Sequence, residues 1–352
     1  MKSREGACFM RAEVSIEDPE FYIKQAFLNA RKALSQKEKK RKKSKSGFFS
    51  AKRRYADRIT LFQQFFKERF SEIIGAFPEL WRLSPFYREL TNITFGVDEF
   101  KNALGSLSWT ISKINGLSSQ YRIKILSADN LEEARNLMRE YEGRISSLLR
   151  ELSPALNFLR TAKEEIRNYP IVRQDTFTVA IAGFPNVGKS TLLSKLTKSR
   201  PDIAPYPFTT KSLLLGYASA FDFASSDIQI IDTPGTLDRP EKMNSIEKQA
   251  YSAMRNLANL IVYVFDPTLQ YPLQLQEQLL SEITTFGKPV IIYISKTDIQ
   301  SEEVVRTVEE IKNKHNSFTN SEELASELRR IAREYYAKLK AQKFGNKNKG
   351  SN

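Results

Sequence analysis

The chain contains the stretch Thr176-Phe-Thr-Val-Ala-Ile-Ala-Gly-Phe-Pro-Asn-Val-Gly-Lys-Ser-Thr191, in which an apolar run leads directly into Gly-x-x-x-x-Gly-Lys-Ser. This order is typical of a phosphate-binding loop between a strand and a helix. Gly183 and Gly188 allow backbone angles that turn successive N–H groups inward around a phosphate. We expect Lys189 to reach the β- and γ-phosphate oxygens and Ser190 to coordinate Mg²⁺. The alternative is an ordinary glycine turn between a strand and a helix.

Three further apolar runs each end in polar residues. Residues 228–231 precede Asp232-Thr-Pro-Gly235, residues 260–265 precede Asp266-Pro267, and residues 290–294 precede Ser295-Lys-Thr-Asp298. Motifs at the carboxyl ends of successive buried strands, with helices between them, are typical of a doubly wound, mostly parallel sheet around one crevice. The sequence therefore predicts an α/β P-loop domain.

The polar residues after these runs have chemistry that suits a nucleotide. Asp232 can hold the Mg²⁺ shell, and Gly235 can turn its N–H onto a γ-phosphate. The Asp298 carboxylate can accept two hydrogen bonds from guanine, whereas adenine would leave this charge unpaired. The motifs therefore favour GTP over ATP, against the alternative that Lys296 and Asp298 lie in a solvated loop.

The first half of the chain has the periodicity of amphipathic helices. One stripe of apolar residues recurs at spacings of three and four from Leu131 to Leu152, and a second helix starts at Ser153-Pro154. These stripes are the pattern of a helical core. We expect an all-α helical bundle over residues 1–170, a GTPase domain over 171–340 that includes the last helix, and a basic disordered tail over 341–352.

Charge is distributed unevenly between these parts. Residues 1–170 hold 32 Lys and Arg against 21 Asp and Glu, a net charge of 32 − 21 = +11, within a whole-chain charge of +14. The densest cluster is the basic segment, residues 37–54, in which Phe48 and Phe49 are interleaved. Cations can neutralise RNA phosphates while aromatic rings stack on bases, although a solvated face or a loop is the alternative. The predicted RNA-binding residues are Lys39, Lys40, Arg41, Lys42, Lys43, Lys52, Arg53 and Arg54.

Composition narrows the class of protein further. The single cysteine, Cys8, excludes an intrachain disulfide and suits a reducing compartment. The single histidine, His315, lies in a polar stretch, which leaves no material for a zinc site or histidine catalysis. The amino terminus lacks the apolar core of a signal peptide, and no run has the length of a membrane span. We therefore expect a cytoplasmic protein, a monomer that does not engage membranes.

The motifs together resemble a known family of GTPases. Gly183-Phe-Pro-Asn-Val-Gly-Lys-Ser-Thr191, Tyr206-Pro-Phe-Thr-Thr-Lys211 and Asp232-Thr-Pro-Gly235, followed by the Lys-x-Asp at 296–298, stand in the order of the Obg-type, translation-factor-related GTPases. The longer motif at 232–240, with the segments at 86–90 and 96–109, resembles the nucleolar GTP-binding protein 1 family and its archaeal relatives. This resemblance covers roughly residues 15–340 and implies GTP/GDP binding and a role in assembling the large ribosomal subunit, with its rRNA and ribosomal proteins as partners.

The resemblance also bears on hydrolysis. Ras-like switches place a water-orienting glutamine just after the Asp-x-x-Gly glycine, but Thr236 stands there, so slow intrinsic hydrolysis is expected. In related GTPases an asparagine at the position of Asn186 helps to hold a monovalent cation, which adds K⁺ as a second candidate ion. Thr210 is the expected switch threonine of the Mg²⁺ shell, with Thr209 as the alternative.

Two departures from the family pattern concern the guanine site. Ser295 stands where an asparagine is usual in the family. No apolar strand is evident before the loop that normally closes over guanine, so Ser317 is the only remnant of that loop. The expected nucleotide-binding residues are Gly183, Asn186, Val187, Gly188, Lys189, Ser190, Thr191, Lys296, Asp298 and Ser317. The expected catalytic residues are Lys189, Thr210, Gly235 and Asn186, and the expected metal ligands are Ser190, Thr210 and Asp232.

Three classes of function follow from these expectations. The leading one is a GTP-hydrolysing assembly factor that contacts large-subunit rRNA through its basic helical part. The second is a non-catalytic rRNA-binding placeholder in which GTP is only a structural ligand. The third is a membrane or cytoskeletal GTPase, which the lack of an apolar lipid-inserting loop disfavours.

Overall fold

The computed structural model describes residues 14–40, 47–169, 172–173, 176–197, 202–204, 213–219, 227–232 and 245–348. The chain divides into two compact units. One consists of Cys8–Leu83 and Phe95–Arg167, and the other includes Ser84–Thr94 and Asn168–Asn352. In the described residues, the first unit contains helices and no strand, and the second contains the sheet. Within the described ranges, no helix is both long enough and apolar enough to cross a bilayer.

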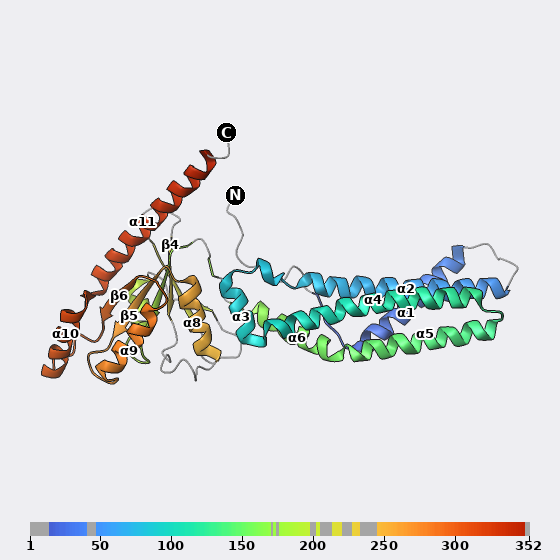
Figure 1. Ribbon diagram of the computed structural model, residues 1–352, viewed down its shortest axis with the longest axis horizontal. Helices are drawn as coiled ribbons and strands as arrows, with labels where there is room; N and C mark the ends of the chain where they lie inside the picture. The colour runs from blue at the N-terminus through green and yellow to red at the C-terminus, as the bar shows by residue number, and fades with distance from the viewer. Residues whose placement is uncertain are drawn as a thin grey trace. The chain divides into compact units, whose positions relative to one another are not determined.

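The helical unit is a bundle of long helices. Its elements are α1 (Pro19–Lys40), α2 (Gly47–Ala76), the short 3₁₀ helix η1 (Leu80–Arg82), α4 (Val97–Ser127), α5 (Leu131–Glu151) and α6 (Ser153–Arg167). Helix α2 packs on α1 and α4, and α4 also packs on α5 and α6, as Figure 1 shows. The helices predicted to begin at Leu131 and at Ser153 are confirmed.

The core of the bundle is rich in aromatic rings. Phe62, Phe66 and Phe70 recur every fourth residue of α2 and are almost completely buried. The ring of Phe62 stacks on Tyr141 of α5, with 6.3 Å between ring centroids, and the Tyr141 hydroxyl shares a 2.9 Å hydrogen bond with Ser118 of α4. Since each buried aromatic side chain contributes roughly 1.5–3 kcal/mol of apolar burial, this stripe is a main source of the stability of the bundle.

Helix α3 (Pro85–Phe95) belongs with the sheet-containing unit, although it lies between α2 and α4 in the chain. Its Tyr87 hydroxyl accepts a 3.0 Å hydrogen bond from the Val172 N–H, and its Glu89 carboxylate accepts one of 2.8 Å from the Ser252 hydroxyl. The predicted single bundle over residues 1–170 is therefore interrupted, because α3 forms hydrogen bonds with Val172 and Ser252 of the sheet-containing unit.

The second unit is built on a seven-stranded sheet within the described residues, in the order β2-β3-β4-β1-β5-β6-β7. Strands β1 (Thr178–Ala182), β4 (Asp227–Asp232), β5 (Leu260–Phe265), β6 (Val290–Ile294) and β7 (Ser317–Phe318) run parallel, whereas β2 (Asp202–Ala204) and β3 (Leu213–Ser219) form an antiparallel edge. The predicted doubly wound, mostly parallel sheet is confirmed. Strands β1 and β5 are completely buried, as central parallel strands must be.

Besides α3, the described part of this unit contains the helices α7 (Lys189–Leu196), α8 (Ser245–Leu257), α9 (Leu273–Thr284), α10 (Glu302–Lys314) and α11 (Ser321–Asn348). The last of them corrects the predicted tail, because α11 continues through residues 341–348 instead of ending at 340. This stretch includes Ala341, Gln342 and Lys343, which favour helix, and basic residues suit the negative end of a helix dipole. Residues 349–352 lie outside the described part of the chain.

Candidate nucleotide site

The glycine-rich loop connects the carboxyl end of β1 to the first turn of α7. Gly183 has φ +146°, and a Cβ at this position would lie 2.7 Å from the Val264 carbonyl oxygen of the neighbouring strand β5. Gly188, with φ +94°, is the N-cap of α7, and the exposed Asn186 between them also has a positive φ of +59°. The loop therefore has the backbone geometry predicted for phosphate binding, in which side chains are excluded from the points of close approach.

Lys189 lies at the start of α7 and is only 7% exposed. Its ammonium group donates a 2.6 Å hydrogen bond to the Phe184 carbonyl oxygen within the same loop. Burial lowers the pKa of Lys189 to about 8, and the Asp232 carboxylate opposes that shift. A buried cation at the amino-terminal end of a helix is an arrangement that attracts an anionic ligand.

Ser190 and Asp232 meet at the end of the sheet. The Ser190 hydroxyl donates a 2.5 Å hydrogen bond to Asp232 Oδ2, which joins the first turn of α7 to the end of β4. Asp232 Oδ1 is buried and accepts no hydrogen bond, and burial raises the pKa of this carboxyl. A hydroxyl and a carboxylate with an oxygen left over fit a hard cation such as Mg²⁺, which binds oxygen ligands.

The predicted guanine-recognition residues follow β6. The backbone N–H and the hydroxyl of Ser295 each donate a 3.0 Å hydrogen bond to the Phe265 carbonyl oxygen. Lys296 has a positive φ of +52°, and its ammonium lies 2.6 Å from Asp266 Oδ2. Asp298 is exposed in the turn that follows. The parallel pairing of β1, β5 and β6 brings this segment to the same edge of the sheet as the phosphate loop, and a Cβ at Gly188 would lie 3.5 Å from that of Ser295.

One part of the predicted base site needs correction. The region before the closing loop does contain a strand, because Ser317 and Phe318 form β7 and pair with Ile292 and Tyr293 of β6. Ser317 thus lies within the sheet, and its buried hydroxyl has no hydrogen-bond partner. A strand of two residues leaves almost no pattern to read. The residues that follow it are Thr319 and Asn320, and the Asn320 side chain accepts a 2.7 Å hydrogen bond from the Glu322 N–H in the first turn of α11.

The remaining predicted nucleotide residues divide into two groups. Val187 is completely buried in the core, and Thr191 is exposed on α7. Thr210, its alternative Thr209, Gly235 and Thr236 lie outside the described residues. Sequence reasoning did not single out Asp266 as a functional residue, although a carboxylate at the end of an apolar strand is a visible signal.

The structure also corrects the predicted RNA-binding set. Residues 47–54 form the first turns of α2, so the loop that stood as an alternative to RNA binding does not apply to them. Lys52 is only 8% exposed, because its ammonium donates a 3.1 Å hydrogen bond to the Leu126 carbonyl oxygen in the last turn of α4. This lysine therefore satisfies a helix end, where a cation is favourable, and is not available to a ligand. Arg53 and Arg54 are exposed, as is Phe49. The side chains of Lys39 and Lys40, and residues 41–43 entirely, lie outside the described part.

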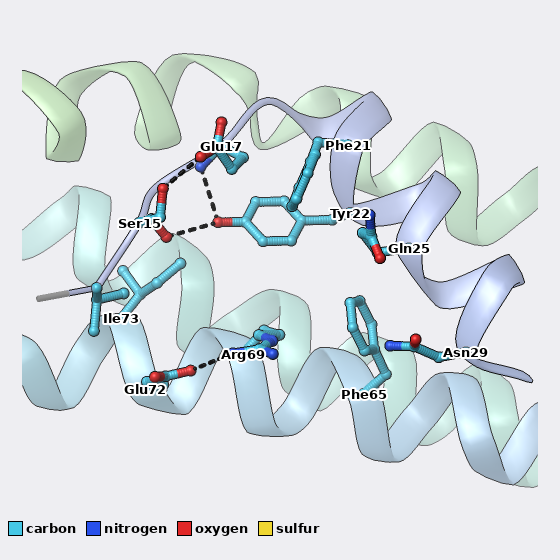
Figure 2. Close-up of a pocket in the computed structure, with 11 residues that line it drawn as sticks. Ser15, Glu17, Phe21, Tyr22, Gln25, Asn29, Phe65, Arg69, Glu72 and Ile73 are labelled. Atoms are coloured by element: carbon cyan, nitrogen blue, oxygen red, sulfur yellow. Dashed lines mark hydrogen bonds and ion pairs between the residues drawn. The ribbon is translucent and has the colours of Figure 1, made fainter. Parts of the chain in front are cut away.

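The helical unit contains a recess of about 350 Å³ between the start of α1 and α2 (Figure 2). Its polar groups are largely paired with one another. The Tyr22 hydroxyl donates to the Ser15 carbonyl oxygen and accepts from the Glu17 N–H, and Arg69 forms a 2.8 Å ion pair with Glu72. These bonds hold the segment before α1 against Tyr22 of α1, whose ring packs edge-on against Phe70 of α2, so the recess has a structural explanation.

The glycine loop, its buried lysine and the serine–aspartate pair at the end of the parallel strands define a P-loop GTPase domain. Comparison with known families agrees, since the family described as 50S ribosome-binding GTPase matches residues 178–296 and the NOG1 N-terminal helical domain matches residues 17–172. The chain belongs to the nucleolar GTP-binding protein 1 family, which confirms the resemblance seen in the motifs.

Individual relatives show how much of the family this chain represents. An uncharacterized protein of Methanocaldococcus jannaschii is 38% identical over 243 residues, which are 68% of this chain and 67% of that protein. Probable nucleolar GTP-binding protein 1 of Dictyostelium discoideum is 33% identical over 71% of this chain and 38% of its own length. For nucleolar GTP-binding protein 1 of Saccharomyces cerevisiae the identity is 32%, over 80% of this chain and 45% of that protein. The chain thus spans less than half the length of the latter two relatives.

Proposed function

We propose that this protein binds and hydrolyses GTP and acts in the assembly of the large ribosomal subunit through contacts with rRNA. The observation that carries the enzymatic part is the convergence of Lys189, Ser190 and Asp232 at the glycine loop. Phosphate oxygens would supply the anionic partner of the buried Lys189 ammonium, whose charge is otherwise opposed by burial. Ser190 and Asp232 would hold Mg²⁺, together with Thr210. When bound there, Mg²⁺ would supply positive charge that stabilises the negative charge developing during phosphoryl transfer.

The proposed hydrolysis is slow in the free protein. Thr236 offers no amide to orient a water molecule, so the chain lacks the usual glutamine of Ras-like switches. Asn186, exposed with a positive φ at the edge of the loop, is the residue that we propose to support a K⁺ ion beside the phosphates. A monovalent cation there would take the place of an arginine finger as a source of positive charge.

The decisive measurement is GTP turnover with and without large-subunit precursor particles. Lys189→Ala should abolish turnover, because no other described cation is buried inside the loop. Lys195→Ala is the matched control, since Lys195 is exposed at the other end of the same helix and should leave turnover unchanged. Retained turnover in Lys189→Ala would show that the phosphate site is elsewhere.

The same measurement separates the competing functions. A non-catalytic placeholder would bind GTP with equal affinity on and off the particle, and the particle would not stimulate turnover. A membrane or cytoskeletal GTPase would sediment with liposomes or filaments and would not bind ribosomal particles. The match of the chain to a family described as ribosome-binding supports the assembly function over both.

The RNA-binding part rests on charge. The basic segment 37–54 includes the end of α1 and the first turns of α2, where Arg53, Arg54 and Phe49 are exposed, Phe49 to 71%. Cations with an exposed ring suit phosphates and unpaired bases. Neutralising Lys39, Lys40, Arg41, Lys42 and Lys43 should weaken binding to rRNA and lower the logarithmic salt slope by about 0.9 for each duplex phosphate that the variant no longer neutralises.

A matched control keeps this test specific. Lys312, Lys338 and Lys340 are exposed on α10 and α11, and their neutralisation should leave the slope unchanged while GTP turnover of the free protein stays the same in both variants. If only the control set lowers the slope, the electrostatic contact belongs to the GTPase unit and not to the basic segment.

A further inference from the structure

Asp266 is a buried carboxylate at the end of β5 that the proposed chemistry does not use. It is 0% exposed, and each of its oxygens has a defined partner. Oδ1 accepts a 3.0 Å hydrogen bond from the Thr268 N–H and a 2.7 Å hydrogen bond from the Thr268 hydroxyl. Oδ2 accepts from the Lys296 ammonium over 2.6 Å. A completely buried charge is tolerated only when it is paired and hydrogen-bonded in this way, so the position of the carboxylate is strongly determined.

The backbone of Asp266 is held as firmly as its side chain. Gln276 of α9 is completely buried, and its amide pairs with the Asp266 peptide at both ends. Gln276 Oε1 accepts a 2.9 Å hydrogen bond from the Asp266 N–H, and Gln276 Nε2 donates a 3.0 Å hydrogen bond to the Asp266 carbonyl oxygen. Nε2 also donates to the Tyr271 carbonyl oxygen over 2.8 Å. Asp266 therefore cannot shift without breaking several buried hydrogen bonds.

Lys296, by contrast, has little else to fix it. Its side chain is 29% exposed, and Asp266 is its ion-pair partner. The adjacent Ser295 also turns to β5, since both its N–H and its hydroxyl donate to the Phe265 carbonyl oxygen. The whole segment that begins the guanine-recognition motif is thus fastened to the carboxyl end of β5, and the only charged contact in this attachment among the described residues is the one from Asp266 to Lys296.

We infer that Asp266 is a positioning residue for guanine-nucleotide binding. It acts by holding the Lys296 side chain in one conformation before the nucleotide binds. A lysine has many rotamers, and ordering it only on binding would reduce affinity. With its ammonium anchored on Asp266, the methylene stem presents a fixed apolar face beside Asp298, where a planar base can pack while the carboxylate of Asp298 pairs with it. This inference rests on the proposed binding of guanine nucleotide.

The test is Asp266→Asn, which retains the shape of the side chain and an oxygen for Thr268 but cannot pair with the ammonium. We expect the dissociation constants of fluorescent GDP and GTP, with Mg²⁺, to rise about tenfold, the effect of leaving one flexible side chain to be ordered on binding. Turnover at saturating GTP should be unchanged, because Asp266 does not touch the phosphate site. Unchanged affinity would overturn the inference, as would an equal loss of affinity and saturating turnover.

A double-mutant cycle with Lys296→Met separates positioning from a general structural role. If Asp266 acts through Lys296, Asp266→Asn should cause no further loss of affinity in the Lys296→Met background. A full additional loss there would mean that Asp266 serves the fold and not the lysine. The cycle is read by nucleotide affinity, with thermal unfolding recorded for each variant.

A second pair of variants keeps the inference testable if Asp266→Asn does not fold. Thr268→Val removes the hydroxyl that fixes Oδ1 and should weaken nucleotide binding several-fold, whereas Thr268→Ser retains the hydroxyl and should bind like the parent. Equal affinity of the two variants would overturn the inference. The outcomes are distinct from failure of the proposed function, since in that case the unmodified protein itself would not bind guanine nucleotide.

Discussion

Replacement of Gly183 by alanine should disrupt the phosphate loop through its contact with the neighbouring strand. The added Cβ would lie 2.7 Å from the Val264 carbonyl oxygen and 3.2 Å from Val187 Cγ2, and the residue would retain a φ of +146°. A side chain in such a backbone conformation costs about 1–3 kcal/mol, and overpacking against fixed atoms costs about 1–3 kcal/mol more. The GTPase unit should therefore lose about 2–6 kcal/mol of unfolding free energy.

Two other glycines separate the terms in this estimate. Gly287 has a positive φ of +66°, but an added Cβ would meet no atom within 4 Å, so Gly287→Ala carries only the backbone cost of about 1–3 kcal/mol. Gly143 lies exposed in helix α5 with equally open space, so Gly143→Ala should stabilise the bundle by about 0.5–1 kcal/mol. The difference between Gly183→Ala and Gly287→Ala measures the close approach of β1 to β5.

The two units need different assays. Both tryptophans, Trp81 and Trp109, lie in the helical unit, so their fluorescence during urea unfolding follows the effect of Gly143→Ala. Hydrogen exchange of peptides covering β1 and β5 follows the GTPase unit, where Gly183→Ala should raise exchange in both strands and weaken nucleotide binding. If Gly183→Ala and Gly287→Ala destabilise the unit equally, the close contact with Val264 has no energetic weight and the geometric reasoning is wrong.

Three further predictions concern separate sites. Asp298→Asn should lower the preference for GTP over xanthine nucleotide in competition binding, because an amide can pair with the xanthine carbonyl that replaces the guanine amine. K⁺ should stimulate hydrolysis more than Na⁺ at equal ionic strength, and Asn186→Ala should remove this difference; equal rates in the parent protein would exclude a cation role. Lys52→Met should cost the bundle about 1 kcal/mol in urea unfolding, by leaving the Leu126 carbonyl unpaired, without changing the salt slope of RNA binding.

The glycine loop and the strands around it were readable from the sequence because their signals are local. A phosphate loop needs glycines, a lysine and a serine at fixed spacing between a strand and a helix, and these residues are consecutive at 183–190. The apolar runs that form β4, β5 and β6 are likewise contiguous. A continuous apolar run indicates a buried strand even when the strand that it pairs with is not known. The long helices were visible because α-helical periodicity repeats over many residues.

The features that the sequence did not predict depend on residues far apart in the chain. The two-residue strand β7 exists only because β6 offers an edge to pair with, and α3 joins the sheet-containing unit through partners around Val172 and Ser252. Lys52 belonged by composition to a basic segment, yet it is buried because a carbonyl 74 positions away lies within reach of its ammonium.

The sequence by itself determined the order of the helical and sheet-containing parts and the position of the glycine loop between a strand and a helix, because each follows from consecutive side chains and backbone freedom. The tertiary structure alone decided which charged side chains are exposed to a ligand and which are buried and paired within the protein. Asp266 and Lys296 are 30 positions apart, and only the parallel pairing of β5 with β6 brings their side chains within 2.6 Å. Burial and pairing are properties of the packed chain, and a linear order of residues does not contain them.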